Sequence, residues 1–372
     1  MKVAVVGGGI AGLFAAWYLQ RENAEVALFE PGPLGAGSIH AAGIIEPSTM
    51  YRTNTLSFLR RVVRLYRNGT CRFRSADPRW LAESLRQFER APPPGAEAVI
   101  GEISSVSVAA YRQFADRAND FGYAAGGLIE RFEDPAHFAE ERAEALARQA
   151  KVPVEVREHG RVGELFFPEV SWLHTEKFVE RMGRELPAVE VVPKAVDRVA
   201  LDGSVVVEGG TRRFDGVVAA TGVGLRRLGV PLTGLRGYGW RTRASGRAEV
   251  ATILVDRGIA IVPFADETKV TGGWDFDLST DPRRARGVRD AIERAVPLDG
   301  PLDLKQGSRP CTPDGLPTVG RRERLVVATG GFRLGWSFAP GMGRAAARLA
   351  LGESENDPFL ARFCSHLHAG AP

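Results

Sequence analysis

Three glycines near the start of the chain, Gly7, Gly9 and Gly12, precede an acid, Glu30, which lies 18 residues after Gly12. Glycine at the first place permits a tight turn, at the second lets the backbone approach a pyrophosphate, and at the third lets a helix pack closely on a strand. An acid at about this distance accepts hydrogen bonds from an adenosine ribose. The spacing therefore predicts dinucleotide binding, and it does not distinguish NAD from FAD because both carry adenosine diphosphate.

The segments around these residues have the composition of the elements that such a site needs. Residues 2–6 form a short apolar run suited to a buried parallel strand, residues 13–20 are expected to form a helix, and residues 26–29 the next strand. The helix would point its positive end at the phosphates. Because all these features agree, we favour dinucleotide binding over a purely structural glycine-rich turn.

The size and composition of the chain indicate a two-domain globular protein. Its 372 residues exceed what one hydrophobic core normally supports, and 44% of them are apolar and 25% charged. The net charge of +4 is spread over scattered basic residues, so no nucleic-acid partner is expected.

The cysteines and the N-terminus favour a cytoplasmic location. Cys71, Cys311 and Cys364 are odd in number and lack CxxC spacing, so neither a disulfide framework nor a metal site is expected. The first strand leaves no room for a signal peptide, and no apolar run is long enough to span a membrane. Residues 58–67 could form a basic amphipathic helix that lies peripherally on the inner membrane face, but we favour a solvated helix.

Three further segments bear on which dinucleotide is bound. Residues 31–47 are rich in glycine and alanine, which leaves backbone groups unshielded, as edge contacts with a flat ring system would require; an ordinary surface loop is the alternative. Residues 215–222 form an apolar run that ends in Ala-Thr-Gly. Residues 306–344 contain an Arg309-Pro310 pair, a strand at 325–329, and a final helix expected to begin near Pro340.

In this order, over residues 3–344, the segments resemble the D-amino-acid oxidase superfamily of FAD-dependent oxidoreductases, which includes glycine oxidase, D-amino-acid dehydrogenase and archaeal dye-linked proline dehydrogenase. Residues 53–88 and 126–129 resemble stretches of the D-amino-acid dehydrogenases. The resemblance implies an α/β fold in which a Rossmann-like FAD-binding domain is interleaved with a mixed, largely antiparallel α+β substrate domain. Residues 1–47, 154–228 and 306–372 would form the FAD-binding domain, and residues 48–153 and 229–305 the substrate domain.

The resemblance also implies non-covalent FAD. Sarcosine oxidases attach the flavin through a cysteine several residues before a stretch that here begins at Thr312, whereas Cys311 directly precedes it. The residues expected to contact FAD are Gly7, Gly9, Ile10, Ala11, Gly12, Glu30, Pro31, Gly37, Ser38, His40, Ala42, Gly43, Val196, Ala220, Thr221, Gly222, Arg309, Gly331, Phe332, Arg333, Leu334, Gly335 and Trp336.

Arginines are the first candidates for binding substrate. Enzymes of this superfamily move a hydride from the carbon that bears the amine to flavin N5 and leave an imine. The protein must hold the α-carboxylate, and the planar fork of an arginine does so with two parallel hydrogen bonds. By resemblance Arg309 is the first choice, and Arg333, where glycine-oxidase-like relatives also have an arginine, is the second. A solvated surface charge is the alternative for each.

Two further side chains are candidates for the active site. Tyr238, in an expected strand, would contact the substrate or pack in the core. His40, expected beside the flavin, would accept a proton or contact the cofactor, with simple packing as the alternative. Ala260 stands where glycine-oxidase-like relatives often have a tyrosine, which leaves the substrate open. The segments 236–238, 259–264 and 270–273 are expected to be antiparallel strands and turns that cover the flavin.

We therefore predict an FAD-dependent dehydrogenase or oxidase that acts on proline, glycine, sarcosine or a neutral D-amino acid. An artificial dye, a quinone or oxygen would accept the electrons, and the sequence leaves the acceptor, the stereochemistry and the oligomeric state open. The alternative is a flavin-holding subunit of a multi-subunit electron-transfer complex with little activity alone. A nicotinamide dehydrogenase is disfavoured because the chain lacks a second dinucleotide fingerprint.

Overall fold

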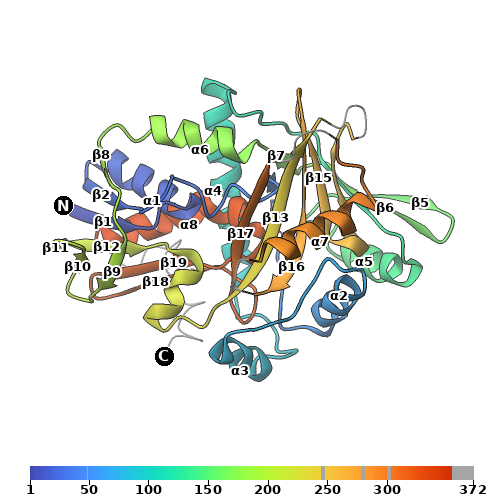
Figure 1. Cartoon of the computed structure of the whole chain (residues 1–372), viewed down its shortest axis with the longest axis horizontal. Coiled ribbons are helices and arrows are strands. Elements are labelled where there is room, and N and C mark those ends of the chain that lie inside the picture. Colours follow the sequence, from blue (N-terminus) through green and yellow to red (C-terminus); the bar gives the residue numbers. More distant parts are fainter. Residues whose placement is uncertain (48, 244–247, 278–280, 300–302, 354–372) are drawn as a thin grey trace.

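Two sheets make up the centre of the molecule. The computed structural model describes residues 1–47, 49–243, 248–277, 281–299 and 303–353. In Figure 1 a six-stranded sheet lies on the left and an eight-stranded sheet on the right. The prediction of an α/β fold that combines a Rossmann-like part with a mixed-sheet part is confirmed.

The six-stranded sheet is built around the N-terminal strand. Its order is β18 (Thr318–Arg322), β19 (Leu325–Thr329), β12 (Gly216–Ala219), β1 (Lys2–Val6), β2 (Glu25–Phe29) and β8 (Val189–Val192). Neighbouring strands are parallel, except that β18 is antiparallel to β19. The strands predicted at residues 2–6, 26–29 and 325–329 are therefore present.

Both faces of β1 are covered. Val3 and Val5 pack on the helical side, whereas Ala4 and Val6 pack against a three-stranded sheet on the other side. That small sheet consists of β9 (Val196–Val199), β10 (Ser204–Val207) and β11 (Gly210–Arg213). A strand buried on both faces must be apolar throughout, which is why residues 3–6 show no alternation with polar residues.

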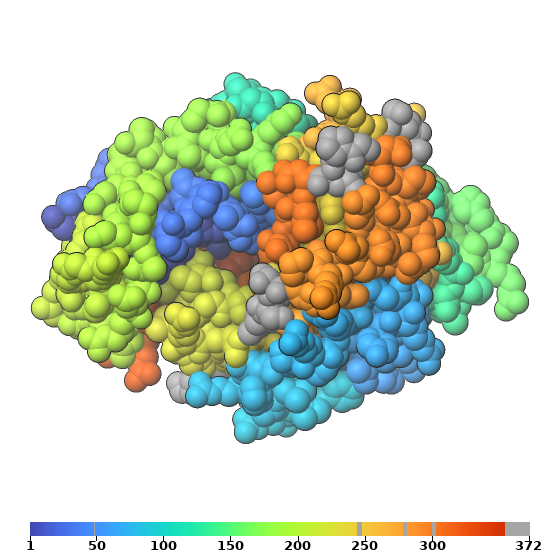
Figure 2. Space-filling view, viewed as in Figure 1, coloured from blue at the N-terminus to red at the C-terminus, as the bar shows by residue number. Residues whose placement is uncertain are grey.

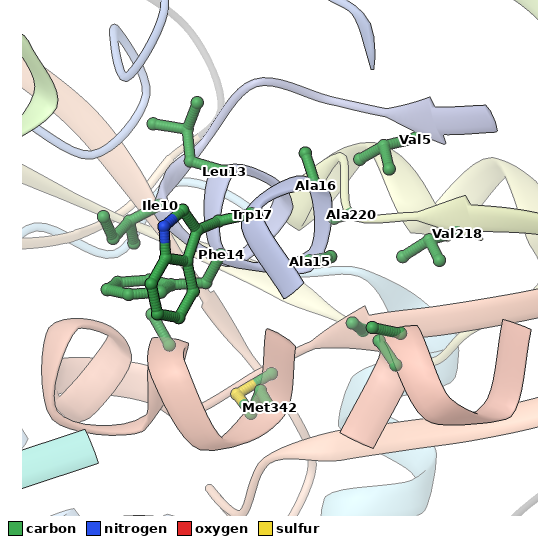
Figure 3. Packing of buried hydrophobic residues seen from close by; sticks show 14 of the residues in the cluster. Val5, Ile10, Leu13, Phe14, Ala15, Ala16, Trp17, Val218, Ala220 and Met342 are labelled. Carbon is green, nitrogen blue, oxygen red and sulfur yellow. The ribbon is translucent and has the colours of Figure 1, made fainter. Parts of the chain in front are cut away.

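Helices α1 (Ile10–Arg21) and α8 (Gly335–Ala350) pack together on the helical side, and α4 (Ala96–Arg117) and α6 (Thr175–Arg184) join the same core. Figure 3 shows Phe14 and Ala15 of α1 close to Met342 of α8. A Cβ atom on Gly343 would lie 2.6 Å from Cβ of Phe14. Glycine at this position therefore permits the close approach of the two helices.

Helix α8 begins earlier than the sequence predicts. Pro340 was expected near its start, but α8 begins at Gly335 and contains Pro340 in its interior. A proline there cannot donate to the carbonyl four residues earlier, which belongs to Trp336. The hydroxyl of Tyr111 donates to that carbonyl oxygen at 2.8 Å, and the N–H of Gly341 donates to Oγ of Ser107 at 3.2 Å. Side chains of α4 thus replace the lost hydrogen bonds, and the predicted start is wrong.

The eight-stranded sheet is mostly antiparallel. Its order is β17 (Leu304–Cys311), β13 (Thr233–Thr242), β16 (Thr268–Phe276), β15 (Ile259–Pro263), β14 (Ala251–Leu254), β4 (Leu128–Arg131), β6 (Val162–Phe167) and β5 (Glu155–His159), with only β14 and β4 parallel among its described strands. Strands β5, β6 and β17 pair in this sheet, although the ranges predicted for the FAD-binding domain contain most of their residues. The division of the chain into two domains stays a prediction.

The remaining elements connect or cover the two sheets. They are the two-stranded sheet of β3 (Ile44–Ile45) and β7 (Ser171–Trp172), the helices α2 (Leu56–Arg67), α3 (Pro78–Arg86), α5 (Pro135–Ala147) and α7 (Pro282–Glu293), and the 3-10 helices η1 (Gly222–Leu228), η2 (Val255–Arg257) and η3 (Phe332–Leu334). In Figure 1, α2, α3 and α5 lie below the eight-stranded sheet, and α7 lies in front of it.

Candidate active site

The glycine-rich turn is fixed by contacts that leave no room for side chains. Gly7 has a φ of +106°, and a Cβ atom there would lie 2.7 Å from the carbonyl oxygen of Ala220. A Cβ atom on Gly12 would overlap the carbonyl oxygen of Gly7. Ala220 follows β12 and precedes Thr221, so the predicted Ala-Thr-Gly segment lies directly against the turn. The fold thus brings together two of the segments expected to bind the dinucleotide.

The N-terminus of α1 is open to an anion. Gly9 is the N-cap residue, it makes no side-chain cap, and the first helical turn, which includes Ala11, contains no acid. Among the described residues, a Cβ atom on Gly9 would meet only Oγ of Ser38, at 3.4 Å, and one on Gly37 would meet nothing within 4 Å. Part of this N-terminal segment (blue) is exposed on the face shown in Figure 2. A helix N-terminus without an acidic cap binds phosphate, so this end fits a pyrophosphate.

Glu30 follows β2, and the turn holds its carboxylate. Its Oε2 accepts a hydrogen bond from the N–H of Gly8 at 2.8 Å, and its Oε1 accepts one from the N–H of Gly32 at 3.1 Å. The neighbouring Pro31 is exposed. Val196, another predicted contact, lies farther along in β9 and pairs with Val207 of β10. The acid therefore lies where an adenosine ribose is expected, beside the glycines.

The segments predicted to lie along the flavin ring also contact each other. The indole N–H of Trp336, in the first turn of α8, donates to the carbonyl oxygen of Ser38 at 3.1 Å, and Oγ of Ser38 accepts from the N–H of Ile10 at 3.1 Å. Ala42 and Gly43 line the same cavity as Trp336. Ser38 therefore links the glycine-rich turn to the start of α8, and a dinucleotide that extends from the turn to the cavity would lie along this link.

The turn from β19 into α8 has an unusual backbone. Gly330, Gly331 and Phe332 have φ values of +86°, +80° and +43°. A left-handed conformation strains a phenylalanine, and its ring is held by edge contacts with Phe58 and Trp274 at centroid distances of 5.7 and 5.2 Å. The turn leads into Arg333, Leu334 and Gly335, so the packing fixes the start of the predicted flavin-contacting segment.

His40 is buried and lacks hydrogen-bond partners. Neither ring nitrogen forms a hydrogen bond of acceptable geometry among the described residues, and a Cβ atom on Gly307 would overlap the ring. Burial, together with the charges of Arg309 and Lys269, lowers the pKa of His40 to about 3, whereas the nearby backbone of Gly37 opposes the shift. The imidazole is therefore neutral near pH 7. Two buried ring nitrogens without partners fit contact with a bound cofactor.

Arg309 forms no ion pair with a carboxylate among the described residues, although the charge of Asp275 raises its pKa. It lies in β17, where the guanidinium crosses Gly237 of β13 at a place that a Cβ atom would overlap. Among the described residues, its only hydrogen bond goes from Nη1 to the carbonyl oxygen of Gly273, at 2.9 Å. Burial lowers the pKa of Arg309 to about 10, and the charge of Arg333 contributes to the shift. Its charge is thus available to an anionic ligand.

Arg333 is surrounded by acidic groups instead. Its Nη2 lies 3.5 Å from Oε1 of Glu46 and 3.9 Å from Oε1 of Glu130, and its guanidinium lies 4.1 Å from the ring centre of Tyr51. The hydroxyl of Tyr51 donates to Oε2 of Glu46 at 3.1 Å. Burial alone would lower the pKa of Arg333, but Tyr51, Glu46 and Glu130 raise it. Both arginines are therefore charged, but they differ in what surrounds them.

Two neighbouring cavities lie beside these arginines and share two lining residues, Glu46 and Arg61. The one that we call the arginine cavity is lined by Ala42, Glu46, Ala260, Trp274, Arg309 and Arg333 among others. The one that we call the acidic cavity is lined by Glu46, Tyr51, Glu130, Glu141, Glu144 and Phe332 among others. The fold therefore places Arg309, Arg333, Ala42 and Gly43 around one cavity.

Tyr238 lies outside this group. It lines neither cavity, its hydroxyl donates to Oδ2 of Asp275 at 3.0 Å, and its ring stacks on Trp240 at a centroid distance of 6.2 Å. Asp275 in turn accepts two hydrogen bonds from Arg284, at 2.7 and 2.8 Å. Burial and Asp275 raise the pKa of Tyr238. These contacts favour the core-packing interpretation of Tyr238, and a role in substrate binding stays untested.

Glu46 and Glu130 were not singled out from the sequence. Leu128 and Glu130 are both buried and lie two residues apart in β4, so strand alternation places the acid on the same face as the leucine. An acid on the buried face of a strand is a signal of function that the sequence does contain. Glu46 ends a run of small and apolar residues, a weaker signal. The pairing of the two acids through Arg333 is visible only in the fold.

Neither the cysteines nor the helices suggest another kind of site. Cys71 and Cys311 are buried and free, and burial raises the pKa of both thiols; Cys364 lies outside the described residues. In the part of the chain that the structure describes, no cluster of three metal ligands occurs, and no helix could cross a membrane. Leu59, Val63 and Tyr66 of α2 are exposed, and whether this helix touches a membrane surface stays a prediction.

A glycine-rich turn on a Rossmann-like sheet, next to a second sheet with a cavity lined by charged residues, is typical of a dinucleotide-dependent oxidoreductase. The chain belongs to the DAO family of FAD-dependent oxidoreductases, whose family model matches residues 2–349. FAD is therefore the dinucleotide, as predicted from the resemblance. The observations at Gly9, Gly37 and His40 agree with a dinucleotide that runs from the turn toward the arginine cavity.

Named relatives cover nearly the whole chain. The chain is 37% identical over 366 residues to a D-proline dehydrogenase of Pyrobaculum islandicum, and the matched region covers 97% of this chain and 99% of that relative. Similar solved structures include an iminodiacetate oxidase of Chelativorans (TM-score 0.69, 17% identity, 97% and 98% of the two chains) and an L-proline dehydrogenase of P. horikoshii (TM-score 0.67, 16% identity, 99% and 98%). At these identities the solved structures support the fold alone.

Proposed function

We propose that this protein oxidises proline at its α-carbon, with the D enantiomer as the preferred substrate, and releases a cyclic imine. The observation that carries the proposal is Arg309, a cavity-lining arginine without a carboxylate partner among the described residues. A substrate carboxylate would supply the missing negative charge through two parallel hydrogen bonds. The name of the relative from Pyrobaculum islandicum supports proline as the first substrate to test.

The rest of the cavity suits a small, partly apolar amino acid. Ile253, Trp274 and Trp336 offer apolar surface to the methylene groups of a pyrrolidine ring. Ala260 and Gly272 both line the cavity, and the small side chain of Ala260 leaves room there, whereas a Cβ atom on Gly272 would meet Cδ1 of Ile292 at 3.0 Å. Proline, glycine and sarcosine all fit this description, so size alone does not select among them.

FAD, when bound, accepts the hydride from the α-carbon. The chain itself orients the substrate: Arg309 would fix the carboxylate, while Gly237 and the Gly273 carbonyl keep the guanidinium in place. Arg333 is held by Glu46 and Glu130, so its charge is less available to a second carboxylate. We therefore assign carboxylate binding to Arg309 rather than to Arg333. A neutral His40 would contact the cofactor rather than act as a strong base.

Anaerobic reduction of the bound flavin tests this proposal directly. D-proline, L-proline, glycine, sarcosine and D-alanine are mixed in turn with the purified flavoprotein, and flavin bleaching is followed by absorbance. We expect D-proline to bleach the flavin fastest. If no amino acid bleaches it and other subunits copurify, the chain is instead a flavin-holding subunit of an electron-transfer complex. Reoxidation in air, compared with reoxidation by an artificial dye or a quinone, then identifies the acceptor class.

A further inference from the structure

The charged groups in and beside the arginine cavity differ in how their charges are balanced. Arg309 has no acidic partner among the described residues, whereas Glu46 and Glu130 share the single guanidinium of Arg333. Arg61 also lines the arginine cavity, but it is already paired with Glu141 at 2.8 Å. With both carboxylates ionised, the set of Glu46, Arg333 and Glu130, which we call the acidic trio, has a net charge of −1. Arg309 and the acidic trio therefore carry opposite net charges.

We propose that Glu46 binds the ammonium nitrogen of the substrate, so that the site selects a zwitterion held between Arg309 and the acidic trio. The inference rests on the proposed function, because it assumes an amino-acid substrate whose carboxylate is bound by Arg309. It adds a second recognition residue on the amine side and, in Glu130, a positioning residue that acts through Arg333.

Glu46 is already oriented for this contact. Its backbone N–H donates to Oγ of Ser337 at 3.0 Å, its Oε2 accepts from the Tyr51 hydroxyl, and its Oε1 faces Arg333. Two carboxylate oxygens offer about four acceptor sites, so these contacts leave acceptor capacity for a substrate N–H. Glu46 lines both cavities, whereas Glu130, the other carboxylate of the acidic trio, lines only the acidic cavity.

Binding as an ammonium is compatible with oxidation. The nitrogen must lose one proton before the α-carbon gives up a hydride, and the carboxylate of Glu46 takes that proton. The electron pair left on nitrogen then forms the C=N bond as the hydride leaves the α-carbon. The acidic cavity, which Glu46 also lines, provides the route by which the proton returns to solvent.

Glu130 sets the charge of the acidic trio. Burial, helped by the charges of Glu141 and Glu46 and opposed by Arg333 and Arg61, raises the pKa of Glu130 to about 7. The Tyr51 hydroxyl also lies nearby. Below this pKa Glu130 is neutral and the trio has no net charge. Above it the trio has a charge of −1 and attracts an ammonium. Ammonium binding should therefore strengthen as pH rises through about 7.

Two ligands separate amine recognition from carboxylate recognition. α-Methylproline keeps the ammonium and the carboxylate but has no α-hydrogen to lose, and tetrahydrofuran-2-carboxylate replaces the nitrogen by an ether oxygen. Their dissociation constants are measured on the holoenzyme by calorimetry. We expect Glu46→Gln to weaken α-methylproline about ten- to hundredfold and the ether less than about threefold. Arg309→Lys should weaken both, and Glu144→Gln, at an exposed acid of the acidic cavity, should weaken neither.

The outcomes distinguish the inference from the proposed function. If proline bleaches the flavin and Glu46→Gln weakens both ligands equally or not at all, the amine contact is wrong and the function stands. If no amino acid bleaches the flavin but Glu46→Gln selectively loses α-methylproline, the function is wrong and the ammonium site stands. Failure of the wild-type protein to bind either ligand counts against the ammonium site as well.

The pH profile tests Glu130 separately. We expect the affinity for α-methylproline to rise through about pH 7 in the wild type and in Glu144→Gln, and to stay flat in Glu130→Gln. His137 is another titratable group near Glu141: burial lowers its pKa, but hydrogen bonds to Asp256 and Glu141 outweigh that effect and raise it. If the affinity of Glu130→Gln for α-methylproline still rises with pH, the titrating group is another one, such as His137, and Glu130 does not set the charge of the acidic trio. Flavin content confirms that each variant is folded.

Discussion

The two ends of the cofactor and substrate site are built in different ways. At the glycine-rich turn, the groups that matter lie mainly within residues 7–38, and shape decides, because added Cβ atoms at Gly7 and Gly12 would overlap the backbone. At the arginine cavity, Glu46, Arg309 and Arg333 come from separate elements, and charge decides. The glycine-rich turn can recognise only the cofactor that every family member shares, whereas the residues that line the arginine cavity can differ between enzymes with different substrates.

Because of this difference, substitutions at the glycine-rich turn and in the arginine cavity should have different kinds of effect. A side chain at the turn acts on the whole molecule, because the turn joins β1 to α1 and touches the end of β12. A substitution in the arginine cavity leaves the sheets intact and changes only which charges face the ligand. Three predictions test the contrast, in order of decreasing effect.

The largest effect is expected from Gly12→Ala. The new Cβ atom would overlap the carbonyl oxygen of Gly7, so α1 must move away from β1. We expect little folded, flavin-containing protein, seen in the flavin-to-protein ratio and in a lower Tm. The matched control is Gly183→Ala in α6, where a Cβ atom meets nothing within 4 Å among the described residues. Alanine favours a helix over glycine by about 0.5–1 kcal/mol, so the control should be neutral or slightly stabilised.

A Gly12→Ala protein with normal flavin content would mean that the contact between α1 and β1 can relax at little cost. The contrast between a shape-determined end and a charge-determined end would then fail. Equal losses in Gly12→Ala and Gly183→Ala would point instead to a general intolerance of helix substitutions.

The second prediction concerns Arg309→Lys. The ammonium keeps the charge but loses the planar fork, so bidentate binding of a carboxylate is lost. We expect kcat/KM for proline to fall about 100- to 1000-fold, with flavin content and Tm nearly unchanged. Arg60→Lys, at an exposed arginine of α2, serves as the control and should leave all three unchanged. Unchanged kinetics for Arg309→Lys would remove Arg309 from carboxylate binding.

The sequence predicts the first end of the site much better than the second. The spacing of Gly7, Gly12 and Glu30 is local, so strand, turn and helix follow from the order of residues alone. Glu46 and Glu130 lie far apart in the chain, and only the pairing of strands brings them to one guanidinium. Local rules also fail where a distant element compensates, as at Pro340, whose missing hydrogen bond is replaced by α4.

The smallest effect is expected from Glu30→Gln, which tests whether the turn recognises its ligand by charge at all. The glutamine oxygen can still accept one of the bonds that Gly8 and Gly32 donate, so the turn should persist. Loss of the carboxylate removes the charge-assisted hydrogen bond expected from the adenosine ribose. We expect about tenfold weaker FAD binding, measured by titration of the apoprotein, with kcat unchanged at saturating FAD.

Glu25→Gln, at the exposed start of the same strand, is the matched control and should not alter FAD affinity. Unchanged affinity in Glu30→Gln would show that Glu30 serves only to brace the glycines. Shape would then be the sole determinant at this end of the site. A loss of flavin as large as that expected for Gly12→Ala would instead show that charge matters at the glycine-rich turn as well as at the arginine cavity. The two ends of the site would then differ only in how far apart their residues lie in the chain.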